Sequence, residues 1–205
     1  MAHLFVDSTY DLTLGLLKDD FSWAKFSTFA NQKASEILQL ETLNLCTEAG
    51  IEVRDLKSVI CVSGPGFYTG LRLSEGFVDV LKFSGIKGYS FYSYEVLPLL
   101  GIKEGNWITK AYRGEYFIHA LKGEGTENIL IPSKELKDFV VDKSHFYIHS
   151  DKAIDDLGRE CMPNAIGTIE LIQKHPEIFK TIIKKNFQRE SYYFRAPEDE
   201  FRTSV

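Results

Sequence analysis

The stretch from Ser63 to Phe77, which reads SGPGFYTGLRLSEGF, places the strongest constraint on how this chain can fold. An apolar, β-branched run from Val59 to Val62 precedes it, and an amphipathic stretch leaves it from Gly70 onward. The pattern therefore predicts a strand, a tight loop and a helix in that order. Glycine permits positive φ and close approach of the backbone, and proline fixes φ at about −65°, so the loop has a defined shape. Thr69 and Gly70 are expected at the helix N-cap.

Two interpretations of this loop compete. In the first, backbone N–H groups at the glycine-bracketed start of the helix hold a phosphate, and Thr69 and Arg72 add side-chain donors. In the second, Gly64 and Gly66 only allow the strand and the helix to pack closely. The sequence contains neither a Walker A pattern nor the dinucleotide-binding fingerprint, so spacing alone does not choose between the two.

The run GPG-x-x-TGLR, from Gly64 to Arg72, resembles the signature of the TsaB (YeaZ) family. Members of that family are subunits of the bacterial machinery that places threonylcarbamoyl on the adenosine next to the tRNA anticodon. This chain has Phe67 and Tyr68 where the family usually has Ser-Phe, and Ser74 where it commonly has glycine.

Composition bounds the class of protein. A chain of 205 residues, of which 44% are hydrophobic, can form one domain or two small lobes. The net charge of −5 argues against a general nucleic-acid-binding surface, so we expect any contact with tRNA to be indirect, through a partner. Three isolated cysteines without a C-x-x-C pattern fit reduced thiols in the cytoplasm. The chain has no signal peptide and no stretch of about 20 apolar residues, which predicts a cytoplasmic protein without membrane contact.

The N-terminal segment predicts a strand meander, with strands at Leu4 to Val6, Leu12 to Leu17 and Trp23 to Phe29. The resemblance implies an α/β, actin-like (Hsp70-like ATPase, ribonuclease H-like) fold with two βββαβα-type lobes, of which the second is divergent. In that fold an acid and small hydroxyl residues at the first turn face nucleotide phosphates, although such residues also stabilise ordinary turns. The resulting vestigial site, for weak binding of ATP or ADP and no other cofactor, comprises Asp7, Ser8, Thr9, Gly64, Gly66 and Thr69.

Two predicted helices carry more apolar surface than one sheet requires. The helix from Lys33 to Ala49 is apolar over most of its circumference, and the helix after the glycine loop has a broad apolar arc. One explanation is that both helices simply cover the sheet. The resemblance implies another, in which they dock onto the homologous catalytic (TsaD-type) subunit or onto a second copy of the chain. The expected interface residues are Ile37, Leu40, Asn44, Arg72, Phe77 and Leu81.

The sequence predicts no metal site. In the catalytic paralogue a metal-binding histidine pair lies in a helix whose equivalent positions here are Ser93 and Leu97, and neither can replace histidine as a ligand. His145 and His149 share one face of a predicted strand, but no third ligand has suitable spacing. His119 is expected to face solvent or to satisfy a local hydrogen bond.

The second half diverges from the family. Strands are predicted from Asn106 to Lys110 and from Glu115 to Leu121, joined by a turn that in the family resembles D-A-R-x-G-E-x-Y. This chain has Lys110 for the aspartate and Tyr112 for the arginine. The resemblance is weak from there until the segment from Tyr193 to Pro197, which resembles the family's C-terminal Y-L-R segment. We predict an N-terminal lobe at residues 1–101 and a divergent lobe at residues 102–205.

The resemblance implies a non-catalytic scaffold subunit without catalytic residues of its own, joined in the complex by a TsaE-type ATPase. An independent actin-like ATPase or kinase is the alternative, although the later half lacks a second glycine-rich phosphate loop with a nearby carboxylate. A third possible function is that of a homodimeric structural protein that has lost its partner.

Overall fold

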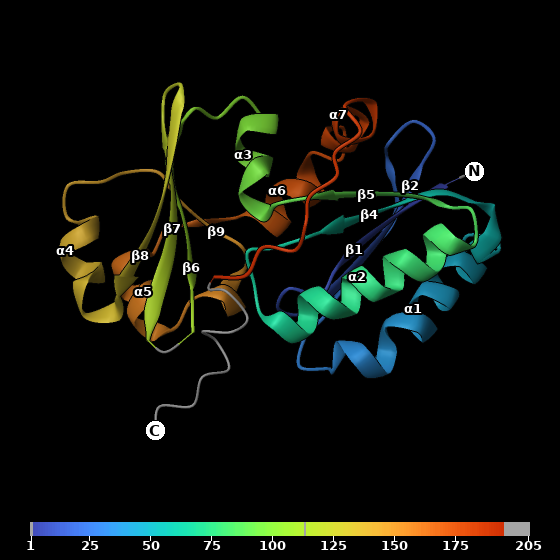
Figure 1. Cartoon of the computed structure of the whole chain (residues 1–205), viewed down its shortest axis with the longest axis horizontal. Coiled ribbons are helices and arrows are strands. Elements are labelled where there is room, and N and C mark those ends of the chain that lie inside the picture. The colour runs from blue at the N-terminus through green and yellow to red at the C-terminus, as the bar shows by residue number, and fades with distance from the viewer. Residues whose placement is uncertain (1, 113, 195–205) are drawn as a thin grey trace. The chain divides into compact units, whose positions relative to one another are not determined.

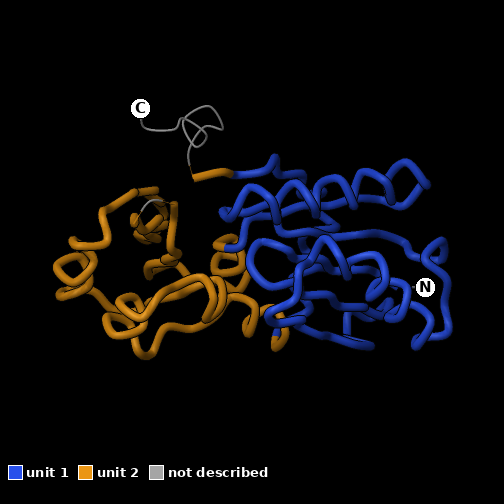
Figure 2. The backbone as a smooth tube through the Cα atoms, turned by 90° about the horizontal axis from the view of Figure 1, so that it is seen from below, with its two compact units in different colours: residues 1–93, 175–192 blue, residues 94–174, 193–205 orange. Residues whose placement is uncertain are grey.

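The computed structural model describes residues 2–112 and 114–194, which form two compact units (Figure 2). The first unit comprises residues 1–93 and 175–192, and the second comprises residues 94–174 and 193–205. The observed boundary therefore lies near the predicted one, but residues 175–192 return to the first unit. The predicted similarity of residues 193–197 to the family's C-terminal segment lies mostly outside the described residues.

The first unit contains a five-stranded sheet with the order β3-β2-β1-β4-β5 (Figure 1). Its strands are β1 (Ala2–Asp7), β2 (Leu12–Lys18), β3 (Trp23–Phe29), β4 (Leu56–Val62) and β5 (Lys87–Phe91). The first three form the predicted antiparallel meander, and β4 and β5 lie parallel to β1. Helix α1 (Ala34–Glu48) precedes β4 and helix α2 (Tyr68–Phe83) follows it, which confirms the predicted βββαβα arrangement.

The two faces of this sheet are covered by different helices. Side chains alternate along β1, so Leu4 and Val6 join the core beneath α1 and α2, whereas Phe5 points to the opposite face. On that opposite face lies α7 (Ile178–Lys184), whose Phe179 ring centroid is 5.3 Å from that of Phe5 and 5.6 Å from that of Trp23. Residues 175–192 belong to the first unit because this aromatic cluster anchors them there.

The second unit repeats the same topology. Its sheet has the order β10-β9-β6-β7-β8, in which β6, β7 and β8 are antiparallel and β9 and β10 run parallel to β6. The predicted divergence of the second lobe is seen in the short strands β9 and β10, which have three and two residues. The strands are β6 (Glu104–Lys110), β7 (Glu115–Lys122), β8 (Gly125–Pro132), β9 (Phe146–Ile148) and β10 (Ile166–Gly167), and the helices are α3 (Val96–Leu99), α4 (Leu136–Val140), α5 (Asp156–Cys161) and α6 (Thr168–Lys174).

One local prediction is wrong, and for His119 the second of its two predicted alternatives, a local hydrogen bond, is confirmed. Helix α2 starts at Tyr68 with Phe67 at its N-cap and no side-chain cap, so Thr69 and Gly70 lie inside the first turn. His119 does not face solvent but is 6% exposed, because β7 is buried on both faces. Its ring stacks on Tyr94 with centroids 3.9 Å apart, and its Nδ1 lies 2.6 Å from the side-chain oxygen of Asn128.

Among the described residues, no helix is both long and apolar enough to cross a membrane.

Candidate functional site

The structure brings the first turn and the glycine loop together. Asp7, Ser8 and Thr9 follow β1, and the loop from Gly64 to Gly66 follows β4, the parallel neighbour of β1. Asp7, Ser8 and Thr9 are at most 2% exposed. Asp7 Oδ1 accepts a hydrogen bond from the Thr9 backbone N–H at 2.8 Å, which is ordinary turn chemistry. Thr69 is exposed in the first turn of α2.

The loop packs against the turn without leaving space between them. A Cβ added to Gly66 would lie 1.9 Å from Thr9 Cγ2, and one added to Gly70 would lie 2.0 Å from the Ser8 carbonyl oxygen. Ser8 Oγ donates to the Gly70 carbonyl at 2.7 Å and lies 2.5 Å from Ser74 Oγ. Gly66 and Gly70 are thus required for close packing, although against the turn after β1 rather than between the strand and the helix that flank the loop.

Two of the three polar side chains after β1 accept or donate hydrogen bonds within the turn and the loop. The Ser8 hydroxyl is paired, and the Asp7 carboxylate binds its own turn. Thr9 Oγ1 is buried and has no hydrogen-bond partner among the described residues. One such hydroxyl offers a single hydrogen bond, whereas phosphate sites gather several donors.

Helices α1 and α2 lie side by side (Figure 1), and each exposes two large apolar side chains. We call Leu40, Leu43, Val80 and Phe83 the apolar helix face; their exposed fractions are 56%, 53%, 65% and 95%. Soluble proteins rarely expose apolar side chains in groups unless the surface binds a partner. This face is therefore the strongest candidate for function in the first unit.

The predicted interface residues are divided by burial. Leu40, Asn44 and Arg72 are exposed. Ile37 and Phe77 are half-buried and pack against the core. The prediction for Leu81 is wrong, because Leu81 is 6% exposed and belongs to the core.

Three members of the apolar helix face were absent from the predicted set, namely Leu43, Val80 and Phe83. Leu43 follows Leu40 at the i, i+3 spacing of one helix face, and Phe83 follows Val80 at the same spacing. That spacing was the available signal.

A groove of about 610 Å³ separates the two helices and is lined by Leu38, Leu73, Phe77 and Val80, among others.

Most charged side chains on α1 and α2 form ion pairs within the chain. Arg72 binds Glu75 at 2.8 Å, and Lys82 binds Asp79 at 3.1 Å. Lys33 binds Glu36 at 3.0 Å, and Lys25 binds Glu48. The surroundings of the apolar helix face are therefore close to electrically neutral.

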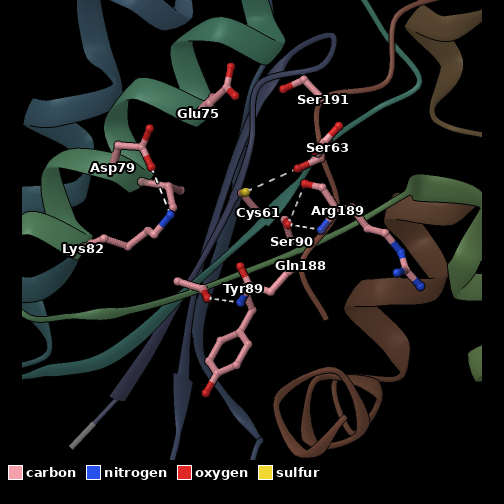
Figure 3. A pocket seen from close by; sticks show the side chains of 13 residues that line it. Cys61, Ser63, Glu75, Asp79, Lys82, Tyr89, Ser90, Gln188, Arg189 and Ser191 are labelled. Carbon is pink, nitrogen blue, oxygen red and sulfur yellow. Dashed lines mark hydrogen bonds and ion pairs between the residues drawn. The ribbon is translucent and has the colours of Figure 1, made fainter. Parts of the chain in front are cut away.

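A second cavity, of about 310 Å³, lies between α2, β4 and β5 and the segment from residue 187 to residue 192, which we call the C-terminal strap (Figure 3). Ser90 holds the strap, because its Oγ donates to the Arg189 carbonyl at 2.8 Å and accepts from the Arg189 N–H. Burial raises the pKa of the Cys61 thiol in this cavity to about 12. The thiol is thus protonated at neutral pH and is no nucleophile.

In the second unit, Lys110 forms an internal ion pair. Lys110 Nζ lies 2.8 Å from Asp155 Oδ2, and the Asp155 carboxylate also accepts hydrogen bonds from the Tyr116 hydroxyl and, at 3.1 Å, from the Gly158 N–H. Burial alone would raise the pKa of Asp155, but these partners outweigh it and hold the pKa at about 2. The lysine that departs from the family pattern therefore has a structural partner.

The histidines predicted to share a strand face do not form a metal centre. His145 precedes β9 in a left-handed conformation with φ of 60°, and His149 follows the strand and is 1% exposed. Within residues 2–112 and 114–194, no group of three histidine, cysteine, aspartate or glutamate side chains is arranged to hold a metal ion. Ser93 and Leu97 are fully buried.

Comparison with protein-family models finds no match, and neither does comparison with curated protein sequences. Two solved structures from Pseudomonas aeruginosa are similar in fold. YeaZ is 15% identical with a TM-score of 0.62, over 91% of this chain and 95% of that one. An uncharacterized protein with similarity to the peptidase YEAZ is 15% identical with a TM-score of 0.60, over 93% of this chain and 99% of that one. The chain therefore has the fold of YeaZ over nearly its whole length.

Proposed function

We propose that this chain, which has the fold of YeaZ, is a non-catalytic docking subunit of the complex that transfers threonylcarbamoyl to the adenosine next to the anticodon in tRNA. The observation that carries the proposal is the apolar helix face on α1 and α2. The GPG-x-x-TGLR run from Gly64 to Arg72 supports the assignment to this complex.

The proposed partner is the homologous catalytic (TsaD-type) subunit. Fully burying one large apolar side chain contributes about 1.5 to 3 kcal/mol, so the four members of the apolar helix face offer a substantial driving force. The groove beside Phe77 provides a seat for side chains of a partner helix. Docking would favour the active arrangement of the catalytic subunit, and a TsaE-type ATPase would join the same assembly. The same face would also pair two copies of the chain when the partner is absent.

Packing of the glycine loop supports a role without catalysis. The turn after β1 and the loop after β4 pack directly against each other, with Gly66 against Thr9 and Gly70 against Ser8. The rival function, an independent ATPase or kinase, would require this contact to open. The third candidate function, that of a homodimeric structural protein, would use the apolar helix face to pair two copies of the chain without the catalytic subunit.

The test is co-purification of the tagged chain from its native host, followed by mass spectrometry and sizing. We expect the catalytic paralogue in stoichiometric amount with the wild-type chain. Leu40→Glu and Phe83→Glu should each weaken the complex at least about a hundredfold, because an unpaired charge would be buried. Val141→Glu is the matched control, since Val141 is 73% exposed in the second unit.

Unchanged circular dichroism and melting temperature of each variant would separate lost docking from lost folding. Recovery of the paralogue with Leu40→Glu and Phe83→Glu would overturn the docking assignment. Recovery of the wild-type chain alone, with ATP turnover by the purified protein, would support the independent enzyme. Recovery of a homodimer without turnover would support the structural protein.

A further inference from the structure

We propose that helix α7 carries a direct binding site for the phosphate backbone of RNA. The site consists of Lys180, Lys184 and Lys185, which we call the lysine ridge. This inference rests on the proposed function, because it identifies the surface of the docking subunit that would touch the tRNA substrate of the complex. It replaces the expectation that tRNA contact is only indirect.

The lysine ridge is an unneutralised cluster on an acidic protein. All three lysines are exposed, and none of their ammonium groups forms an ion pair or a hydrogen bond with another described residue. Four other lysines of the first unit, Lys25, Lys33, Lys57 and Lys82, form ion pairs, as in the Lys57–Asp19 pair at 2.7 Å. Since the whole chain has a net charge of −5, the positive potential at α7 is local.

Packing fixes the direction in which the ridge points. Ile178, Phe179 and Ile182 are at most 3% exposed and face the sheet. Lys180 and Lys184 are one helical turn apart and lie on the opposite, outward side of α7. The aromatic cluster around Phe179 holds the helix against β1 and β5, so Lys180 and Lys184 are displayed from a packed helix, and Lys185 follows at its C-cap.

The ridge would remain accessible when the docking helices are occupied. Helices α1 and α2 cover the face of the first sheet that contains Leu4 and Val6, whereas α7 covers the face that contains Phe5. A partner bound to the apolar helix face would therefore lie across the sheet from α7. One chain can thus bind a protein and an RNA at the same time.

The chemistry of α7 favours RNA over an anionic membrane. A helix that lies on a membrane needs large exposed apolar side chains beside its lysines. No described residue between 175 and 192 is a large, exposed hydrophobic side chain. Glu177 is the N-cap residue of α7, and its carboxylate lies 3.1 Å from His175 Nδ1.

The test measures tRNA affinity of the chain and of its complex with the catalytic subunit, from about 50 mM to 200 mM salt. Each lost phosphate contact lowers the slope of log affinity against log salt by about 1, so Lys180→Glu/Lys184→Glu/Lys185→Glu should lower it by about 2 to 3. Affinity at the lower salt concentration should fall at least about tenfold. The control, Lys103→Glu/Lys134→Glu/Lys137→Glu, makes the same charge change with exposed lysines of the second unit and should leave the slope nearly unchanged.

Equal slopes and affinities for the two triple variants would overturn the inference, as would absence of tRNA binding by the wild-type complex. Binding to phosphatidylserine vesicles that depends on the ridge, with tRNA binding independent of it, would overturn it in favour of a membrane. Sizing separates this inference from the proposed function. Failure of the wild-type chain to form the complex contradicts the proposed function, whereas normal assembly with an unchanged salt slope contradicts only the lysine ridge.

Discussion

Two glycines of helix α2 differ in their surroundings. A Cβ on Gly70 would lie 2.0 Å from the Ser8 carbonyl oxygen, whereas a Cβ on Gly76 would have nothing within 4 Å. Alanine is the better helix former at both positions by up to about 1 kcal/mol. We expect Gly70→Ala to destabilise the protein by about 1 to 3 kcal/mol, because the backbone of the first turn must move. Gly76→Ala should stabilise it. Urea unfolding measures both, and stabilisation by both changes would contradict the packing role of Gly70.

Two buried histidines make stability depend on pH. Burial, helped by Lys57, lowers the pKa of His3. Burial also lowers the pKa of His119, although the hydrogen bond between His119 and the Asn128 side-chain oxygen acts in the opposite direction. The unfolded chain therefore binds protons at a higher pH than the folded chain does. Stability should be complete above about pH 6.5 and should fall as the pH approaches the lowered folded values.

Denaturant unfolding between about pH 7 and pH 5 tests this prediction. Asp155 remains ionised in this range, since its pKa is held at about 2. His119→Gln should flatten the pH dependence of the second unit while leaving that of the first. A free energy of unfolding that does not change over this range would contradict the prediction.

At the scale of elements, helices α1 and α2 present an apolar surface, whereas α7 presents lysines. The apolar helix face lies among ion pairs that are already closed, such as Arg72–Glu75 and Lys82–Asp79. The affinity of docking at this face should depend only weakly on salt. Exposed ion pairs contribute little to the free energy of binding, and dissolved salt already screens them. We expect the dissociation constant of the protein complex to change by less than about threefold from 50 mM to 200 mM salt. Calorimetric titration measures it, and a steep salt dependence would show that charged residues rather than the apolar face control docking.

At the scale of the whole molecule, the chain leaves the first unit at Ser93 and returns to it at His175. Phe179 then completes the aromatic cluster with Phe5, Trp23 and Phe91. Phe179→Ala should cost the first unit about 3 to 5 kcal/mol, since it empties a fully buried site. The second unit should be unaffected.

The two tryptophans allow each unit to be followed separately. Trp23 lies in the first unit and Trp107 in the second, and the chain has two tryptophans in total. Phe179→Ala should lower the unfolding midpoint reported by Trp23 in a Trp107→Phe background. Ile172→Ala in α6 is the matched control and should lower the midpoint reported by Trp107 in a Trp23→Phe background. Equal shifts at both tryptophans would mean that the units unfold together.

Local patterns were sufficient to predict most elements. The strand from Trp23 to Phe29 was predicted with the observed bounds, because strand alternation is encoded by neighbouring residues. The same patterns did not predict that Leu81 and His119 are buried. Burial of a residue with an ambiguous pattern depends on which distant element covers it, and α2 and β7 are both covered on sides that periodicity does not specify.

The sequence by itself determined the strand, loop and helix around Gly64 to Gly70 and the βββαβα order of the first unit, because glycine, proline and apolar spacing act over a few residues. Tertiary structure alone decided three further features. It placed Thr9 and Ser8 against the glycines, it left the apolar helix face uncovered, and it carried residues 175–192 back onto the first sheet. Each of these depends on contacts between residues far apart in the chain, where side-chain volume and the available sheet face, rather than local conformational preference, set the outcome.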